Sequence, residues 1–458
     1  MRVCHVKSAV FDDPNLVSAA GLVPVMALAD RAGLGALVAE HVRVPGSAGA
    51  NGPGKVAAVV AGMVAGADSF EDLAVLRHGG MGRLLAAAPA PTTLGTHLRA
   101  YTFGHVRQLD AVASRLLAAL AARTPVLAGV GQVAWIDVDD TIKAMHGYQQ
   151  QGVAYGYSGV KGLNAQLAVL STPMDAPLIA GVRLRKGNVA SAHGAPKLIG
   201  DAVATARRCG AVGLLTVRAD SAYYQRAVVA AARAAGARFS ITARVNPQIT
   251  KAIASIAEHA WTAIRYPNAV FDEQAGGWVC DASIAEVAFT AFTSRPAAEH
   301  VTARLIVRRV KRLNPRTSAG QGELFQTYRY HAIFTDSPEP MLDAEAHHRD
   351  HAIVEQVIAD LKAGPLAHLP SGTFTANAAW TTLATIAFNL TRATAAIAGT
   401  TMARATTATI RRRLIHIAAR VASTARRLHL HLPAAWPWAP AFTTVFEATC
   451  RPPRAASP

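Results

Sequence analysis

Polar side chains recur at helical spacing in HRDHAIVEQVIADLKAG, residues 348–364. At about 100° per residue, a single helix would place His348, His351, Glu355 and Lys362 on one stripe, beside an apolar one. A carboxylate flanked by imidazoles and an ammonium suggests a functional site. An exposed polar face explains the same pattern, so the prediction depends on partners elsewhere in the chain.

Three acids fall at the end of the strand predicted for VAWIDVDD, residues 133–140. Because side chains alternate along a strand, Asp137 and Asp139 share one face, and Asp140 points to the other. A simple alternative is that Asp139 and Asp140 only end the strand and begin a turn. The spacing by itself leaves Asp137 and Asp139 as rivals for a catalytic role.

A fourth acid, Asp220, ends a strand predicted at residues 213–220. If this strand neighbours the one that carries Asp139, two carboxylates meet at one edge of a sheet, and a helix packed alongside brings Glu355. Three converging carboxylates suit two hard divalent cations, Mg²⁺ or Mn²⁺. Such ions activate water or a 3′ hydroxyl and stabilise the leaving oxygen of a phosphodiester. Taken singly, Asp220 could be a helix N-cap and Glu355 a solvated residue.

The helical stripe also allows a transition-metal site, because imidazoles and a carboxylate at this spacing can share one metal. The basic excess of the chain and the two strands that end in Asp would then be coincidences, so phosphodiester chemistry is the better explanation. The sequence has no Walker A loop, no Gly-x-Ser-x-Gly elbow and no His-Glu-x-x-His helix. Nucleotide hydrolases, serine hydrolases and zinc proteases that use these motifs therefore have little support.

The acids lie within an alternating series of predicted elements, in the order β-β-β-α-β-α-β. A meander of strands followed by crossover helices predicts a mixed α/β sheet that is covered on both faces. The series resumes at a strand at 330–337, after residues 245–328, whose strand-like runs predict a β-rich insertion. The earlier strands are expected at 133–140, 164–171, 177–184, 213–220 and 238–245, and the helices at about 195–209 and 223–236.

The flanking regions differ from this core. Residues 15–125 are predicted to be mainly helical. Residues 377–399 are predicted to form a buried helix, because Asn377, Asn389 and Arg392 make a membrane span implausible. The expected regions are a helical N-terminal DNA-end-binding or dimerisation region (1–127), the first part of the core (128–244), the β-rich insertion (245–328), the second part of the core (329–395) and a basic C-terminal region (396–458).

The charge of the chain points to a polyanionic partner. Its 458 residues carry 46 Lys and Arg against 29 Asp and Glu, a formal charge of +17, which favours nucleic acid through steering and counterion release. The four cysteines are far apart in the sequence and include no Cys-x-x-Cys pair, so neither a zinc ribbon nor a disulfide framework is predicted. Because the N-terminus shows no secretory signal, we expect a cytoplasmic protein.

The order of strand Asp, strand Asp and helix Glu on an interrupted core resembles the DDE transposases of bacterial insertion sequences, which have a ribonuclease H-like fold. In one group of these enzymes the third acid lies in Tyr-x2-Arg-x3-Glu-x6-Lys. The frame here is His348-x2-His351-x3-Glu355-x6-Lys362, with His in place of Tyr and Arg. The segments DVDDT and MHGYQQQGVAYGYSGVKGLNA look most similar to the thirteen-eighty family. The resemblance covers residues 130–395 well and the flanks only by general plan.

This resemblance implies a metal-dependent enzyme that cleaves DNA at element ends and joins it to target DNA. The catalytic and metal-binding residues would be Asp139, Asp220 and Glu355, with two Mg²⁺ or Mn²⁺ ions, and the Asp-x-Thr frame selects Asp139. The implied partners are terminal inverted repeats and target DNA, bound by a homodimer in the synaptic complex, at the nucleoid. A nuclease without strand transfer and a catalytically inactive DNA-binding relative are the alternatives. DNA contacts would come from His348, Arg349, His351, Lys362 and Trp278.

Two tryptophans of the predicted insertion are candidates for base stacking. In related transposases an insertion of this kind approaches the DNA end, and a Trp there can stack on a base turned out of the duplex. Trp278 follows two glycines at a predicted hairpin tip, where exposure is expected. Trp261 lies in an alternating strand, where an indole is usually buried, so Trp278 is the favoured platform.

Overall fold

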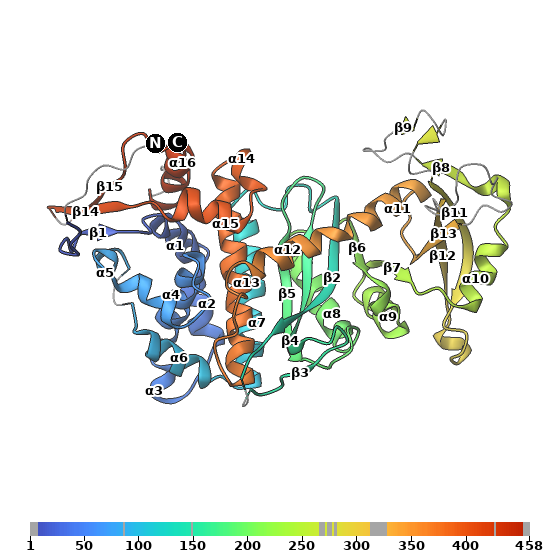
Figure 1. Cartoon of the computed structure of the whole chain (residues 1–458), viewed down its shortest axis with the longest axis horizontal. Helices are drawn as coiled ribbons and strands as arrows, with labels where there is room; N and C mark the ends of the chain where they lie inside the picture. Colours follow the sequence, from blue (N-terminus) through green and yellow to red (C-terminus); the bar gives the residue numbers. More distant parts are fainter. Residues whose placement is uncertain are drawn as a thin grey trace, which may run out of the picture.

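The described part of the chain comprises residues 8–85, 88–147, 150–264, 271–272, 277–278, 282–311, 328–425 and 427–451 of a computed structural model. The molecule is elongated, and the N- and C-terminal regions meet at the end opposite the β-rich end (Figure 1). A sheet and the helices beside it fill the space between.

A mixed sheet of ten strands organises the molecule. Its order is β3-β4-β2-β6-β7-β13-β12-β11-β8, and β5 also pairs with β4. β2 is antiparallel to β4 and parallel to β6, and β6 is parallel to β7. The alternating α/β order predicted from the sequence is therefore present. The strands are β2 (Val133–Ala144), β3 (Ala154–Tyr155), β4 (Lys161–Ser171), β5 (Leu178–Lys186), β6 (Leu214–Ala219), β7 (Arg238–Ala243), β8 (Thr262–Ile264), β11 (Ala282–Ala291), β12 (Val301–Lys311) and β13 (Tyr328–Thr335).

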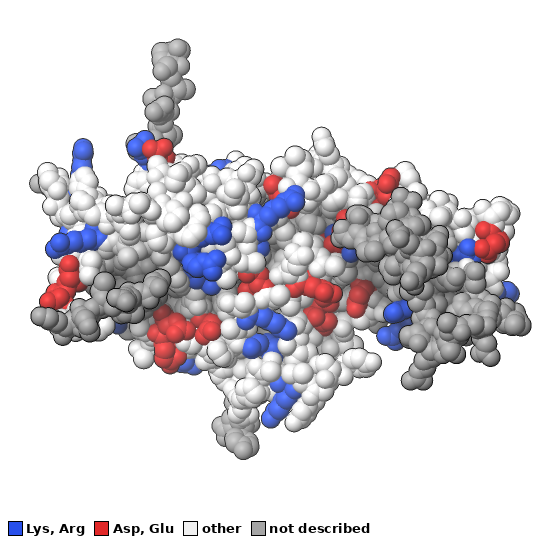
Figure 2. Space-filling model, turned by 45° about the horizontal axis from the view of Figure 1, so that its top comes forward, with Lys and Arg blue, Asp and Glu red and all other residues white. Residues whose placement is uncertain are grey.

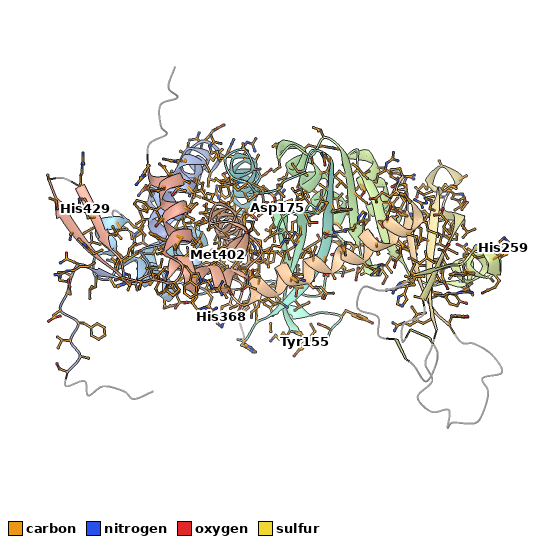
Figure 3. The ribbon with its side chains drawn as sticks, turned by 90° about the horizontal axis from the view of Figure 1, so that it is seen from above. Tyr155, Asp175, His259, His368, Met402 and His429 are labelled. Atoms are coloured by element: carbon orange, nitrogen blue, oxygen red, sulfur yellow. The ribbon has the colours of Figure 1, made fainter. Side chains whose placement is uncertain are left out.

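Helices cover both faces of the central strands, which explains why β4 and β6 are buried along nearly their whole length. Helix α8 (Ala195–Arg208) packs on β2, β4 and β5, and α9 (Arg226–Ala234) packs on α8 and β7. Helix α12 (Ile353–Lys362) packs on β2. Seen from above, α12 (orange) lies on one side of the sheet, and α8 and α9 (green) lie on the other (Figure 3).

The longer strands of residues 245–328 extend this sheet, whereas, among the described residues, the short strands β9 (Phe271–Asp272) and β10 (Gly277–Trp278) pair only with each other. β13 is antiparallel to β7, and β12 and then β11 follow it in antiparallel pairing. The backbone groups at the edge of β7 are thereby paired, so the sheet continues instead of ending there. Other short elements of this part are α10 (Pro247–Ala254) and two 3₁₀ turns (Glu258–Ala260 and Ala297–Glu299).

The N-terminal region is helical, as predicted, and it packs against the C-terminal region. Helix α1 contacts α16 (Ala439–Cys450). Strand β1 pairs with β14 (Ala419–Thr424), which pairs with β15 (Arg427–His431). The two regions expected at opposite ends of the domain order are thus joined. The N-terminal elements are β1 (Leu16–Val17), α1 (Leu22–Arg31), α2 (Leu34–His41), α3 (Gly46–Gly49), α4 (Gly52–Val64), a 3₁₀ helix (Glu71–Arg77), α5 (Met81–Leu84), α6 (Pro91–Arg99) and α7 (Phe103–Ala121).

The long apolar helix α13 (Phe374–Ile397) is the central support of the helical part. Nearly all its residues are buried, against α7, α4, α1 and β5, as the sequence predicted. The elements after it are α14 (Thr400–Ala403), α15 (Thr407–Ile410), a π-helical turn (Arg411–Ile415), β14 (Ala419–Thr424), β15 (Arg427–His431) and α16 (Ala439–Cys450). Within the described residues, no single helix is long and apolar enough to cross a membrane. The bent pair α1 and α2 together would be long and apolar enough, by length and composition only.

The polar segment with which the sequence analysis began is not one helix. It is divided into α11 (Met341–Arg349), a 3₁₀ turn (Asp350–Ala352) and α12. Because a 3₁₀ turn advances 120° per residue, it changes the phase between the helices on either side. The single stripe predicted for residues 348–362 is therefore wrong, and His348 faces a different neighbour from the residues of α12.

Candidate active site

Asp139 lies midway along β2, just past the point where the parallel pairing of β2 with β6 ends, and Asp220 directly follows the last residue of β6. The last paired residues of β2 and β6 are Val138 and Ala219, so the two acids are the next residues on adjacent strands. Burial, together with the charges of Asp220 and Asp140, raises the pKa of Asp139 to about 6. Burial also raises the pKa of Asp220. Two neighbouring carboxylates whose ionisation is opposed chiefly by burial would be stabilised in their charged form by a cation between them.

Asp220 also has the structural role that its position allows. Its carboxylate accepts a hydrogen bond from the backbone N–H of Ala222 at 3.0 Å and so caps the 3₁₀ turn Ser221–Tyr223. The cap uses one carboxylate oxygen. The N-cap interpretation and the site interpretation of Asp220 are therefore compatible.

Asp137 is neutralised by an arginine that the sequence analysis did not single out. Arg218 of β6 donates to both carboxylate oxygens, at 2.6 and 2.7 Å, and both side chains are buried. His351 donates from Nδ1 at 2.9 Å, and Ser171 at 3.3 Å. Burial opposes ionisation of Asp137, but Arg218 and His351 outweigh it and hold its pKa below the usual value. A lone arginine within the apolar run LLTVRA was the signal that could have revealed this pair.

Asp140 is neutralised in the same way on the opposite face of β2. Arg185 of β5 pairs with its carboxylate. Asn164 donates to the same carboxylate at 2.7 Å and Ser191 at 3.0 Å. Within the described residues, Asp139 is thus the acid of this strand that pairs with no arginine or lysine.

Glu355 lies on the helix that runs along the same face of β2. At one end of this helix His351 contacts Asp137, and at the other end Lys362 lies near enough to Lys143 for the Lys143 charge to lower the Lys362 pKa, after burial. Four helical residues and two strand residues each span about 6 Å. The step from His351 to Glu355 along the helix is therefore about as long as the step from Asp137 to Asp139 along the strand.

The residue types fit a divalent metal site, but the three acids are not gathered in one cluster. Glu355 is exposed. Over the part of the chain that the structure describes, no group of three His, Cys, Asp or Glu lies close enough together to hold a metal ion. Acidic side chains do gather near the middle of the molecular surface, with basic side chains around them (Figure 2). Asp139 and Asp220 supply carboxylate oxygens of the kind that divalent ions prefer, and Glu355 lies on the neighbouring helix α12.

Comparison with known families decides the class of the protein. The family model described as transposase DDE domain group 1 matches residues 4–452, nearly the whole chain. The chain belongs to this transposase family. No curated protein matches it. Membership supports a transposase function, implies DNA binding, and agrees with the general use of divalent metal ions by DDE transposases.

In this DDE transposase, His348 is a core residue. Its ring is 8% exposed and bonds to the hydroxyls of Ser240 and Thr242 of β7, each at 2.9 Å. Burial, with the nearby charges of His351 and Arg218, lowers its pKa to about 3. The structure contradicts the DNA contact predicted for His348, because a buried neutral ring with both nitrogens occupied offers nothing to a phosphate.

The other predicted DNA contacts of the transposase lie in different settings. Arg349 donates from Nε to both oxygens of the buried Glu345, at 3.0 and 2.9 Å, and lines a cleft at the start of α12. Lys362 is exposed. Trp278 falls in β10, and its side chain lies outside the described residues. Trp261 is half-buried beneath the Arg309 guanidinium, 4.2 Å from its ring centre, as expected of a packed indole.

Proposed function

We propose that this transposase uses Asp139, Asp220 and Glu355 to cleave DNA at element ends and to transfer the freed 3′ end into target DNA, a cut-and-paste reaction. The observation that carries the proposal is that Asp139 and Asp220 are the next residues after the last pair of the parallel strands β2 and β6. The neighbouring acids Asp137 and Asp140 are each neutralised by an arginine. Asp139 is thereby the acid of β2 that remains available.

The topology supports a ribonuclease H-like core for this reaction. The strands β5-β4-β2 are joined in antiparallel pairs, and β6 and β7 then add in parallel. Residues 245–328 separate β7 from β13 and so occupy the place of an insertion into that core. This arrangement, with the Glu-x6-Lys spacing on α12, favours the insertion-sequence group whose third acid lies in that frame, and the thirteen-eighty family within it.

When bound, two Mg²⁺ or Mn²⁺ ions would activate the attacking water or hydroxyl and stabilise the leaving oxygen. Asp139, Asp220 and Glu355 would hold them. His351, whose charge acts on both Asp139 and Asp220, would lie against the reacting phosphate. The Asp137 carboxylate fixes its ring, because Nδ1 is the nitrogen that donates and Nε2 faces away from Asp137.

The remaining proposed contacts lie around this centre. Arg349 and Lys362 would bind phosphates on either side of Glu355, and Trp278 would stack on a base at the DNA end. The partners would be terminal inverted repeats and target DNA, held by a homodimer in a synaptic complex at the nucleoid. A ribonuclease H-like nuclease without strand transfer is the second candidate, because the same acid pair serves cleavage alone.

One assay separates these functions. The purified protein is incubated with Mg²⁺ and a duplex made from the DNA that borders its gene, together with a target plasmid. Joined products support the transposase, and cleaved products alone support the nuclease. A mobility shift without cleavage indicates an inactive DNA-binding relative and contradicts the proposal.

A further inference from the structure

Four lysines beyond the acid pair have no carboxylate partner in the part of the chain that the structure describes. Lys143, Lys161, Lys186 and Lys362 form no side-chain hydrogen bond or ion pair with the described residues, and neither does Lys251 of α10, a helix that contacts β11 near the other edge of the sheet. A side-chain ammonium that is neither paired nor needed for packing is available to an anionic ligand. The question is whether these four share one surface.

The strand register places two of them on the face that carries Asp139. Alternate residues of β2 share a face, so Lys143 lies on the same face as Asp139. Lys143 is paired with Leu163 of β4, which is paired with Lys186 of β5. Because residues directly opposite each other in neighbouring strands share a face, Lys186 is on it too.

The next row of the sheet adds a lysine and an exposed aromatic ring. Lys161 precedes Leu163 by two residues on β4, so it lies on the same face, and it is paired with Tyr155 of β3. The Tyr155 side chain is 68% exposed. Figure 3 shows Tyr155 on the α12 side of the sheet, pointing away from the ribbon.

Lys362 reaches this face from the helix above it. It lies close enough to Lys143 for the charge of Lys143 to lower its pKa, after the effect of burial. Two ammonium groups held near one another on separate elements repel, and an anion between them removes that cost. A phosphate is the anion that this protein family handles.

The geometry points to a path for the DNA duplex. We propose that Lys143, Lys161, Lys186, Lys362 and Tyr155 form a phosphate track along which the duplex leaves the acid pair, from Asp139 toward β3. The inference rests on the proposed function and adds the direction of the bound DNA. The lysines would supply the sequence-independent phosphate contacts that hold a duplex in register. Tyr155 would contact the DNA at the end of the track farthest from Asp139.

The dimensions of the track match a short length of duplex. From Asp139 to the row of Lys161, β2 advances six residues, about 20 Å at about 3.3 Å per residue. A duplex advances about 3.4 Å per base pair, so Tyr155 would meet the DNA about six base pairs from the cleaved phosphate.

The first test measures the salt dependence of binding. A fluorescein-labelled duplex from the DNA bordering the gene is titrated without divalent metal, at several salt concentrations. Each of Lys143→Gln, Lys161→Gln, Lys186→Gln and Lys362→Gln should flatten the log-log slope by about 0.9, the value for one lost phosphate contact. Lys197→Gln is the matched control, because Lys197 is an exposed lysine of α8 that pairs with Asp201 on the opposite face. Its slope should equal that of the wild type.

The second test locates Tyr155 on the DNA. Duplexes with 5-iodouracil at successive positions are bound to the wild type and irradiated. Crosslinking should peak about six base pairs from the cleaved phosphate and disappear in Tyr155→Ala. Thermal unfolding of each variant confirms that it is folded.

The outcomes separate the track from the proposed function. If the wild type cleaves the duplex but the four lysine variants have the slope of Lys197→Gln, the track is wrong and the function stands. A crosslink that survives in Tyr155→Ala removes Tyr155 from the track. If the wild type neither binds nor cleaves these duplexes, the proposed function and the track fail together.

Discussion

Asp137 on β2 accepts two hydrogen bonds from Arg218 on β6, at 2.6 and 2.7 Å, at the buried centre of the sheet. This ion pair distinguishes Asp137 from Asp139, which lies two residues later on the same face of β2 and has no arginine partner among the described residues. An acid that is saturated by arginine has little charge to offer a metal ion. The choice between the two rivals is therefore made by a partner on another strand.

Alanine at Asp139, Asp220 or Glu355 should abolish DNA cleavage, by at least about a thousandfold, while binding of the end duplex changes little, because these acids are proposed to hold metal ions rather than phosphate. Single-turnover cleavage and fluorescence anisotropy on the same preparations test this. Wild-type cleavage in any one variant would remove that residue from the site.

Asp137→Ala should impair the protein mainly by lowering the free energy of unfolding. It leaves Arg218 buried without its partner, and breaking a buried pair in this way costs about 3–5 kcal/mol. Urea unfolding should show that loss. The double variant Asp137→Asn with Arg218→Met removes both charges and should recover much of it. If Asp137→Ala unfolds like the wild type, the ion pair is not formed in solution.

His351 and Asp137 should act as a unit in cleavage. Loss of a hydrogen bond to a charged group costs about 1.5–3 kcal/mol, so His351→Ala should slow cleavage by about ten- to a hundredfold. In the background of His351→Ala, the further change Asp137→Asn with Arg218→Met should have little additional effect on the cleavage rate of the folded protein. Independent, additive losses in this double-mutant cycle would show that Asp137 does not act through His351.

His348 should make the fold less stable in acid. Its folded pKa is about 3, whereas an unfolded histidine titrates near 6.5. Between these values the unfolded chain binds the extra proton, so the stability of the fold is full above about pH 6.5 and falls as the pH drops toward 3. Chemical unfolding of wild type and His348→Gln from pH 4 to 7 tests this, and the variant should have the shallower dependence. An equal slope would mean that His348 is not the titrating group.

Trp278 should report on an unstacked base at the DNA end. A 2-aminopurine at the terminal base pairs should fluoresce more weakly when stacked on an indole, so Trp278→Ala should change the signal on binding. Loss of a stacked base costs roughly 1 to 3 kcal/mol. Trp261→Ala is the control, because Arg309 already covers Trp261. Identical signals from wild type and both variants would end the stacking proposal.

The sequence by itself determined the elements and the chemistry that they carry. Alternation placed Asp137 and Asp139 on one face of a strand and Asp140 on the other, and the apolar length of residues 377–399 predicted a buried helix. Such patterns depend on neighbours along the chain, because the backbone conformation of each segment sets the period of its side chains. Asp220, at the end of the strand predicted at residues 213–220, was identified for the same reason.

Only the tertiary structure decided which of these groups are available. Asp137 and Arg218 are 81 residues apart in the chain, and their contact depends on the parallel register of two strands. His348 shared a helical period with His351, but a 3₁₀ turn changed the phase and β7 buried the ring. The face shared by Lys143 and Lys186 likewise depends on pairing across β4. Strand register and helix phase are set by packing between distant segments, so they cannot be predicted from the periodicity of side chains within one segment.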